Sequence, residues 1–165
     1  MNTLKTNLGY FLAVSSAKGL TSLKWQQMPF SKRDCLSDEN QNVSHETIRQ
    51  LQHYLSGSIK SFSLPLDLSN WSVEMQKWFK SLTLVDYGSS ISYQQLAEKW
   101  GNKKAARAAG QACRRNPIPI IIPCHRIVSS NGSITQYSGG GTQNPRDEQN
   151  INRKKWLLNL EAHFH

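Results

Sequence analysis

"NPIPIIIPCHRIVSS", residues 116–130, sets three prolines around an apolar run and then places Cys124, His125 and Arg126 side by side. Proline has no N–H to donate and fixes its own φ, so this segment cannot form a regular central strand. We expect a buried, rigid lead-in that brings a thiol and an imidazole to one position. That pair suits nucleophilic chemistry, whereas a buried inert thiol beside a hydrogen-bonded histidine is the ordinary alternative for a Cys-His dipeptide.

The residues after this triplet predict a hairpin and a loop. Residues 127–128 continue as an extended run, the Ser-Asn-Gly turn at 130–132 is a strong hairpin signal, and residues 133–135 return. Tyr137 and Ser138 then lead into a run of three glycines. The backbone of such a loop can approach a ligand closely.

Two helices with a short turn between them precede the proline segment. Ser92 and Gln95 form an S-x-x-Q capping box at the start of the first helix, and Gly101 ends it. Asn102 caps the second helix, "KKAARAAGQACRR" at residues 103–115, which the following Asn-Pro pair terminates. This order of elements predicts a helix-turn-helix.

The second of these helices has one face of small residues and one basic face. Alanines 105, 108, 109 and 112 share the small face, and the other face carries four residues that we call the basic stripe: Lys104, Arg107, Gln111 and Arg114. The chain has 20 Lys plus Arg against 11 Asp plus Glu, a formal net charge of +9, which favours a polyanionic partner. A solvated charged face on an ordinary helix is the alternative. The net charge and the turn together favour nucleic acid.

The first third of the chain predicts a small α+β unit. Residues 10–25 have the composition of two short strands with a turn between them. Residues 45–55 predict a helix that Ser44 caps. "FSLPLDL", residues 62–68, alternates like an edge strand, because Pro65 excludes it from the centre of a sheet.

A change in composition near Asn70 predicts a domain boundary, with an α+β domain at residues 1–68 and a second domain at 69–165. The second domain would gain a helix at residues 72–85 and another at 153–164, each with apolar residues at helical spacing. The core-facing set of the last helix is Trp156, Leu157, Leu160 and Phe164.

Glu161 is carried towards the same apolar face of the last helix. A carboxylate buried there needs a partner, because an unpaired charge in a low dielectric is costly. One partner would be a surface lysine, Lys154 or Lys155. The other would be His125, which would join Cys124, His125 and Glu161 into a base-relay group.

The cysteines and the hydropathy limit the other possibilities. Cys35, Cys113 and Cys124 form no CxxC pair and no zinc-like spacing with histidine, so we expect a reducing compartment and no metal. No stretch approaches the roughly 20 apolar residues that span a bilayer. We therefore expect an intracellular protein.

Several of these motifs occur together in one known family. "IPCHRIV" at 122–128 follows "AARAAG" and "NPIPII", with "ISYQQLA" upstream and "YSGG" and "KKWLLNLE" downstream. In this order the chain resembles the O6-alkylguanine-DNA alkyltransferases over most of residues 64–161. The resemblance implies an α+β protein, with an N-terminal ribonuclease-H-like domain followed by a helical domain that carries the helix-turn-helix and the Pro-Cys-His-Arg active site.

The resemblance also assigns the chemistry. It implies that Cys124 accepts the alkyl group, that His125 and Glu161 activate the thiol through a water, and that Asn116 holds the segment in place. Tyr93 would help rotate the nucleotide out of the helix. The base pocket would involve Tyr137, Ser138 and Ile127.

On the DNA side, the resemblance implies that Arg107 fills the gap left by the flipped nucleotide. The other implied DNA contacts are Lys104, Gln111, Arg114, Ser92 and Ala106. The substrate would be O6-alkylguanine in double-stranded DNA, with O4-alkylthymine as a further substrate, and each molecule would react once without a cofactor. We expect a monomer in the cytoplasm, or in the nucleus of a eukaryote; cooperative binding along DNA is an open alternative.

Two stretches depart from the family pattern. "TQNPRDEQNINR", residues 142–153, lengthens the interval before the last helix by about ten residues, and its polarity predicts a solvated loop. "VDYGSS", residues 85–90, replaces the usual Ile-Pro-Tyr-Gly run.

Three other classes of protein were weighed against the alkyltransferases. Alkyltransferase-like proteins that bind lesions without repair usually have tryptophan in place of Cys124. A cysteine hydrolase would need an oxyanion site that the sequence does not indicate. A regulatory helix-turn-helix protein would leave the Cys-His-Arg run without a purpose.

Overall fold

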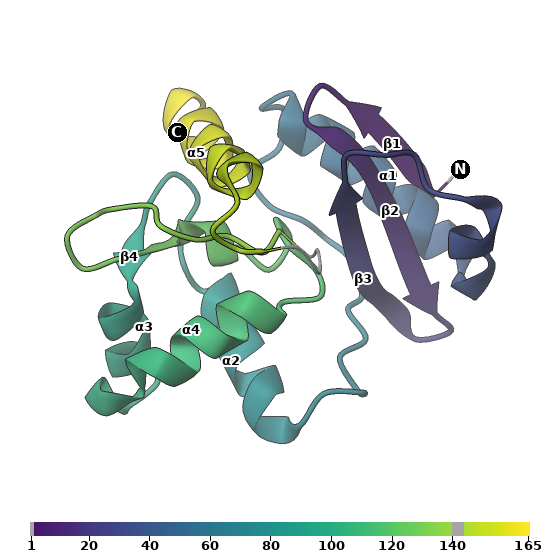
Figure 1. Ribbon diagram of the computed structural model, residues 1–165. Helices are drawn as coiled ribbons and strands as arrows, with labels where there is room; N and C mark the ends of the chain where they lie inside the picture. Colours follow the sequence, from purple (N-terminus) through teal and green to yellow (C-terminus); the bar gives the residue numbers. More distant parts are fainter. Residues whose placement is uncertain (1, 140–143) are drawn as a thin grey trace. The chain divides into compact units, whose positions relative to one another are not determined.

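The computed structural model describes residues 2–139 and 144–165, and the chain divides into two compact units, Met1–Asn70 and Trp71–His165 (Figure 1). The first unit combines a small sheet with helices, and the second is mainly helical. The expected α+β class is therefore confirmed.

The first unit is built on a three-stranded antiparallel sheet in the order β1-β2-β3. The strands are β1 (Thr3–Thr6), β2 (Gly9–Ser16) and β3 (Gly19–Gln26), and the expected hairpin is the β2–β3 pair. A short 3-10 helix, η1 (Lys32–Ser37), precedes α1 (Gln41–Leu55). The apolar residues of both element types form the core, which includes the Phe11 and Trp25 rings at 4.5 Å between centroids.

Two expectations for this unit are wrong in detail. The cap of α1 is Asn40, whose side chain accepts from the Val43 N–H, and Ser44 lies inside the helix. The Ser44 hydroxyl is buried and bonds to Asp38 Oδ1 at 2.6 Å, so a residue that resembled a cap instead ties the helix to the chain before it.

Residues 62–68 do not form a strand. A single parallel bridge joins Leu20 to Leu66, with Leu20 N–H donating to Pro65 O at 2.8 Å and Asp67 N–H donating to Leu20 O at 2.9 Å. Pro65 has no N–H with which to extend the ladder. The segment thus lies beside β3 but pairs with it at one point.

The second unit contains four α-helices in its described part: α2 (Val73–Thr83), α3 (Tyr93–Lys99), α4 (Ala106–Arg115) and α5 (Glu148–His163). The one-turn 3-10 helices η2 (Lys103–Ala105) and η3 (Cys124–Arg126) stand between them. Two-residue strands β4 (Ile91–Ser92) and β5 (Ile127–Val128) pair in parallel. Trp78, Phe79 and Leu82 of α2 are buried, as their spacing predicted.

The helix-turn-helix has the predicted limits. Ser92 and Gln95 form both hydrogen bonds of the capping box, and Gly101 adopts a φ of +92° after α3. Asn102 accepts from Lys104 N–H at 3.0 Å, so the second helix starts as a 3-10 turn before it becomes α4. The left-handed conformation at Gly101 explains why a residue without a side chain ends the first helix.

The expected hairpin after residue 128 is wrong. Strand β5 pairs with β4, which lies before the helix-turn-helix in the chain, and not with residues 133–135. The turn itself exists, since Gly132 N–H donates to Ser129 O at 2.8 Å. Pairing with β4 instead joins the segment that carries Cys124 to the start of α3.

The last helix begins earlier than predicted. α5 starts at Glu148, so the second half of the 142–153 stretch is helical and not a solvated loop, and Asn150 and Arg153 are buried. Residues 142 and 143 lie outside the described residues. Phe164 is 37% exposed, because the helix ends at His163 before that ring can reach the core.

Among the helices of the described residues, none is both long and apolar enough to cross a membrane.

Candidate active site and nucleic-acid interface

The proline-rich lead-in is an irregular, buried segment. Ile118, Ile120 and Ile122 are at most 1% exposed, and Ile120 adopts a φ of +74°, which is rare for a β-branched residue. Asn116 braces the segment at both ends. Its side-chain amide donates to Ile122 O at 2.7 Å, and its Oδ1 accepts from Ile118 N–H at 3.0 Å.

Cys124 begins η3 directly after this lead-in and is 3% exposed. The Asn116 amide also donates to its Sγ at 3.1 Å. Burial raises the pKa of the Cys124 thiol, and the Asn116 hydrogen bond and the Lys154 charge oppose that rise. The thiol is therefore held in its neutral form until something else favours the thiolate.

The next residue, His125, is fully buried, and its Nε2 lies 2.6 Å from Glu161 Oε1. Burial lowers the pKa of His125, and the Glu161 carboxylate opposes this. Of the two partners that the sequence left open for Glu161, the structure shows His125 and not a surface lysine.

Arg126 is a partner of Glu161 that sequence reasoning missed. Its Nε lies 3.1 and 3.0 Å from the two carboxylate oxygens, and its Nη2 lies 3.0 Å from Oε1. Arg126 Nη1 also donates to Val85 O at 2.6 Å, and Gly88 N–H donates to Glu161 Oε2 at 3.0 Å. We call His125, Arg126 and Glu161 the buried ion cluster. It binds the end of α5 to η3 and to the chain after α2.

Lys154 is a second missed residue, and it is 2% exposed. Its Nζ donates to Ile127 O and, at 3.4 Å, to Gln136 O. Burial lowers the pKa of Lys154, and a negative charge on Cys124 or Cys113, as the thiolate, opposes this. A signal existed in the sequence: Lys154 lies seven residues before Glu161, on the same face of the helix.

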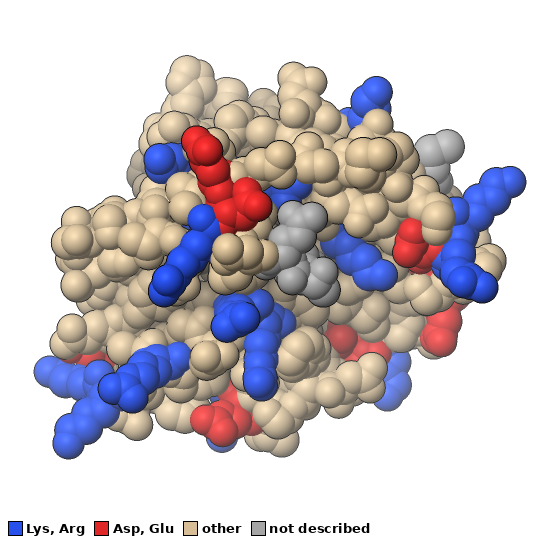
Figure 2. All heavy atoms as spheres, viewed as in Figure 1, with Lys and Arg blue, Asp and Glu red and all other residues tan. Residues whose placement is uncertain are grey.

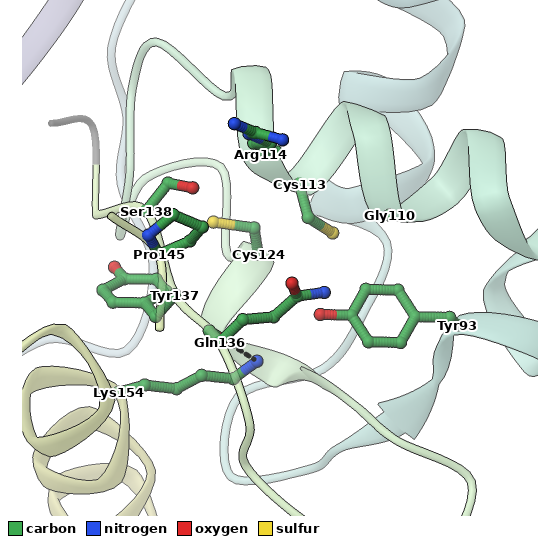
Figure 3. A pocket seen from close by; sticks show the side chains of 10 residues that line it. All are labelled: Tyr93, Gly110, Cys113, Arg114, Cys124, Gln136, Tyr137, Ser138, Pro145 and Lys154. Carbon is green, nitrogen blue, oxygen red and sulfur yellow. Dashed lines mark hydrogen bonds between the residues drawn. The ribbon is translucent and has the colours of Figure 1, made fainter. Parts of the chain in front are cut away.

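A small pocket opens beside the Cys124 thiol (Figure 3). Its lining comes from six segments of the second unit: α3 (Tyr93), α4 (Gly110, Cys113, Arg114), η3 (Cys124), residues 136–138, the turn before α5 (Pro145), and α5 (Lys154). Of the three expected pocket residues, Tyr137 and Ser138 line it. Ile127 does not, and its carbonyl accepts from Lys154.

Tyr93 stands at the first position of α3, with its ring centroid 6.0 Å from Lys154 Nζ. Burial raises the pKa of its phenol, so the hydroxyl keeps its proton near neutral pH. The family resemblance implied that Tyr93 helps to rotate the nucleotide, and the structure places it in the lining of the same pocket as Cys124. A neutral phenol there can donate a hydrogen bond to a bound group.

The basic stripe lies on the exposed face of α4 and its preceding turn. Lys104, Arg107, Gln111 and Arg114 are all exposed, whereas Ala109 and Ala112 on the opposite face are buried. In Figure 2, Lys and Arg side chains gather over the start of α4 and the end of α3. Arg114 also lines the pocket, so the stripe runs from the tip of the helix-turn-helix to the pocket mouth.

The two remaining predicted contacts lie at helix starts. Ser92 is half-buried, and its hydroxyl accepts from Gln95 N–H at 3.1 Å, so it serves as the cap of α3. Ala106 is half-buried as the first residue of α4.

Comparisons with known proteins match both units. Residues 74–163 match the family model of the 6-O-methylguanine DNA methyltransferase DNA-binding domain. Residues 1–68 match that of the ribonuclease-like domain of the same methyltransferases, so the expected N-terminal fold is confirmed.

Relatives of known name and structure agree with these matches. The constitutive methylated-DNA–protein-cysteine methyltransferase of Bacillus subtilis is 34% identical, over 96% of this chain and 93% of the relative. The hamster protein (Cricetulus griseus) of that name is 48% identical, over 68% of this chain and 52% of its own. The Mycobacterium tuberculosis enzyme in complex with DNA is 31% identical with a TM-score of 0.80, over 98% of this chain and 92% of that one. The chain therefore belongs to the 6-O-methylguanine DNA methyltransferase family.

Proposed function

We propose that this protein repairs alkylated DNA by moving the alkyl group of O6-alkylguanine onto Cys124, once per molecule. The observation that carries the proposal is the position of the Cys124 thiol: it lines a pocket, Asn116 holds its sulfur, and the buried ion cluster begins at the next residue. An inert core cysteine would need none of these neighbours.

The transfer is a single displacement. Cys124 loses its proton, the Sγ–carbon bond forms, the bond between that carbon and O6 of guanine breaks, and the guanine takes up one proton. We propose that the thiol proton leaves through a water to His125, whose ring Glu161 orients through the 2.6 Å contact. The product thioether is a poor leaving group, which accounts for one turnover per molecule.

The raised pKa of Cys124 has a use in this scheme. A thiol that stays neutral in the free protein reacts slowly with electrophiles in solution, because the thiolate is the nucleophile. The Asn116 donor and the Lys154 ammonium both favour the thiolate at the place where a base would bind. The thiol would thus react with a bound substrate rather than with electrophiles in solution.

Binding to duplex DNA would rest on the basic stripe. Its exposed cations can contact phosphates of any sequence, which suits a protein that must search for rare lesions. Enzymes that act on a base inside a duplex rotate it out of the stack, and a damaged pair costs less to open. We propose that Arg107 occupies the vacated place and that Tyr93 assists the rotation.

O4-alkylthymine would be a second substrate of the same displacement, since it offers the same carbon–oxygen bond. The protein would act as a monomer, without a cofactor, wherever the cell keeps its DNA.

The test is the intact mass of the protein after incubation with duplex DNA that carries one O6-methylguanine. A gain of one methyl group, mapped to the peptide of Cys124, with product that never exceeds the protein in amount, supports the proposal. Cys35→Ser, at a free cysteine of the first unit, is the matched control and should react normally. Tight binding of the lesion by an unmodified protein would instead indicate lesion recognition without repair, and product in excess of protein would indicate a hydrolase.

A further inference from the structure

The polar stretch before α5 contributes to the pocket through a tight turn, residues Asn144–Asp147. Asp147 N–H donates to Asn144 O at 3.0 Å, and Pro145 lines the pocket together with Cys124. This turn belongs to the polar stretch at residues 142–153. It was expected to be solvated, so its place in the pocket wall requires an explanation.

Buried groups hold the turn in place. Pro145 O accepts from Tyr137 N–H at 2.7 Å, which joins the turn to the loop of Tyr137 and Ser138. Asn144 O accepts from Asn150 Nδ2 at 3.1 Å, and Asn150 Oδ1 in turn accepts from Arg153 Nη1 at 3.2 Å. Asn150 and Arg153 are 2% and 4% exposed. Burial of two such polar side chains is costly unless their hydrogen bonds are satisfied, so the turn has a defined position.

The walls of the pocket differ in bulk. On the α4 side Gly110 and Cys113 are small, with the longer Arg114 beside them, whereas the other side presents the proline ring beside Ser138. In Figure 3 the Cys124 sulfur points towards the side that carries Ser138 and Pro145. An alkyl group in transit to that sulfur would therefore lie against the ring.

We propose that the Asn144–Asp147 turn is a size filter on the alkyl group, with Pro145 as the residue that sets the upper limit. This rests on the proposed function of Cys124. The Pro145 ring is rigid and hydrogen bonds fix the position of its turn, so the ring cannot move aside for an alkyl group much larger than methyl. One methylene more or less in an apolar pocket typically changes a rate by about 10- to 200-fold, which is ample for such selection.

The experiment compares transfer from O6-methylguanine and O6-benzylguanine in otherwise identical duplexes, with modified Cys124 measured by mass. Pro145→Ala keeps the carbonyl that accepts from Tyr137 but removes the ring. We expect it to raise the benzyl-to-methyl rate ratio by roughly fivefold or more. Pro29→Ala, at an exposed proline of the first unit, is the matched control and should leave the ratio unchanged.

A second variant tests the hydrogen bond between Asn150 and Asn144 O that holds the turn. Asn150→Asp keeps the shape of the side chain and a partner for Arg153, but its carboxylate cannot donate to Asn144 O. It should loosen the turn and raise the ratio in the same direction. A ratio that stays unchanged in both variants, or two rates that fall equally, would overturn the size filter and leave a structural role.

Failure of the filter is separable from failure of the proposed function. A wild-type protein that gains methyl at Cys124 while the ratio does not respond to Pro145→Ala refutes only the filter. A wild-type protein that never gains methyl at Cys124 refutes both.

Discussion

The buried ion cluster and the basic stripe, both in the second unit, hold their charged side chains in opposite environments. In the cluster, Arg126 and Glu161 are withdrawn from water, and the side chains of His125 and Arg126 share the Glu161 carboxylate. In the stripe, Lys104, Arg107 and Arg114 stay in water without a described acidic partner on their own helix. The first arrangement orients groups and the second attracts a polyanion, so chemistry and binding should be separable by mutation.

Cys124→Ser should separate chemistry from DNA binding most completely. Transfer should be abolished completely, because a serine hydroxyl has a much higher pKa than a thiol and is a weaker nucleophile. DNA affinity should be retained, because the stripe is untouched. Mass spectrometry measures the transfer to the protein, and a binding titration measures the DNA affinity. Lost affinity in a folded variant would contradict the separation and make the cysteine part of the interface.

The next largest effect should come from the cluster itself. Glu161→Gln leaves the Arg126 guanidinium buried without its counter-charge, and removal of one partner from a buried pair costs about 3–5 kcal/mol of unfolding free energy. Chemical denaturation measures it. The control is Glu46→Gln, which breaks the exposed Arg49–Glu46 pair of α1 and should change stability little. Equal losses in both variants would show that burial adds nothing.

A smaller effect concerns pH and the two pocket thiols. Burial raises the pKa of Cys113 and of Cys124 above the unfolded value of 9.0. Above that value the unfolded chain releases protons that the folded protein retains, so the folded state is stabilised below it and loses stability as pH rises beyond it. Unfolding free energies at about pH 8 and about pH 10 should differ less for Cys113→Ser than for wild type. An identical pH slope in the two proteins would mean that Cys113 ionises as readily folded as unfolded.

The smallest effect should come from the stripe. Lys104→Ala should weaken DNA binding by a similar factor for every sequence and reduce the slope of log affinity against log salt by about 1, because one phosphate contact is lost. Lys60→Ala, in the first unit, is a comparison of equal charge and should leave the slope unchanged. A full salt slope in Lys104→Ala would exclude this residue from the phosphate contacts.

The same contrast explains what the sequence could predict. The helix-turn-helix was predicted because its signals are local: the Ser92–Gln95 box, Gly101 and the Asn102 cap each act within four positions of the chain, although the second helix opens with a 3-10 turn before α4 begins. The helix-turn-helix signals need no knowledge of how distant segments pack. Burial of the Glu161 carboxylate demanded a partner but left His125 and a surface lysine open, and the family resemblance favoured His125, which the structure shows in contact with it.

The missed features depend on such packing. Arg126 and Lys154 look like ordinary cations of a basic chain, and only the folded unit brings one to Glu161 and the other to the Ile127 carbonyl. Strand β1 has only four residues and no clear alternation of apolar and polar side chains. Strand β5 pairs with β4, 36 positions upstream, and not with the nearby residues 133–135. The turn at Pro145 could not be predicted because its stretch of sequence is polar and therefore indicated a solvated loop. Its buried polar side chains, Asn150 and Arg153, form hydrogen bonds that only the folded unit shows.

The buried ion cluster also has a consequence for the newly made protein. His125 and Glu161 are 36 positions apart in the chain, so at roughly 5–20 residues per second the ribosome produces the histidine about 2–7 s before the carboxylate. During that interval the nascent thiol is attached to a segment that cannot yet bury it. Each molecule would therefore be most open to indiscriminate chemical damage while it is being translated, before the helix that completes its site exists.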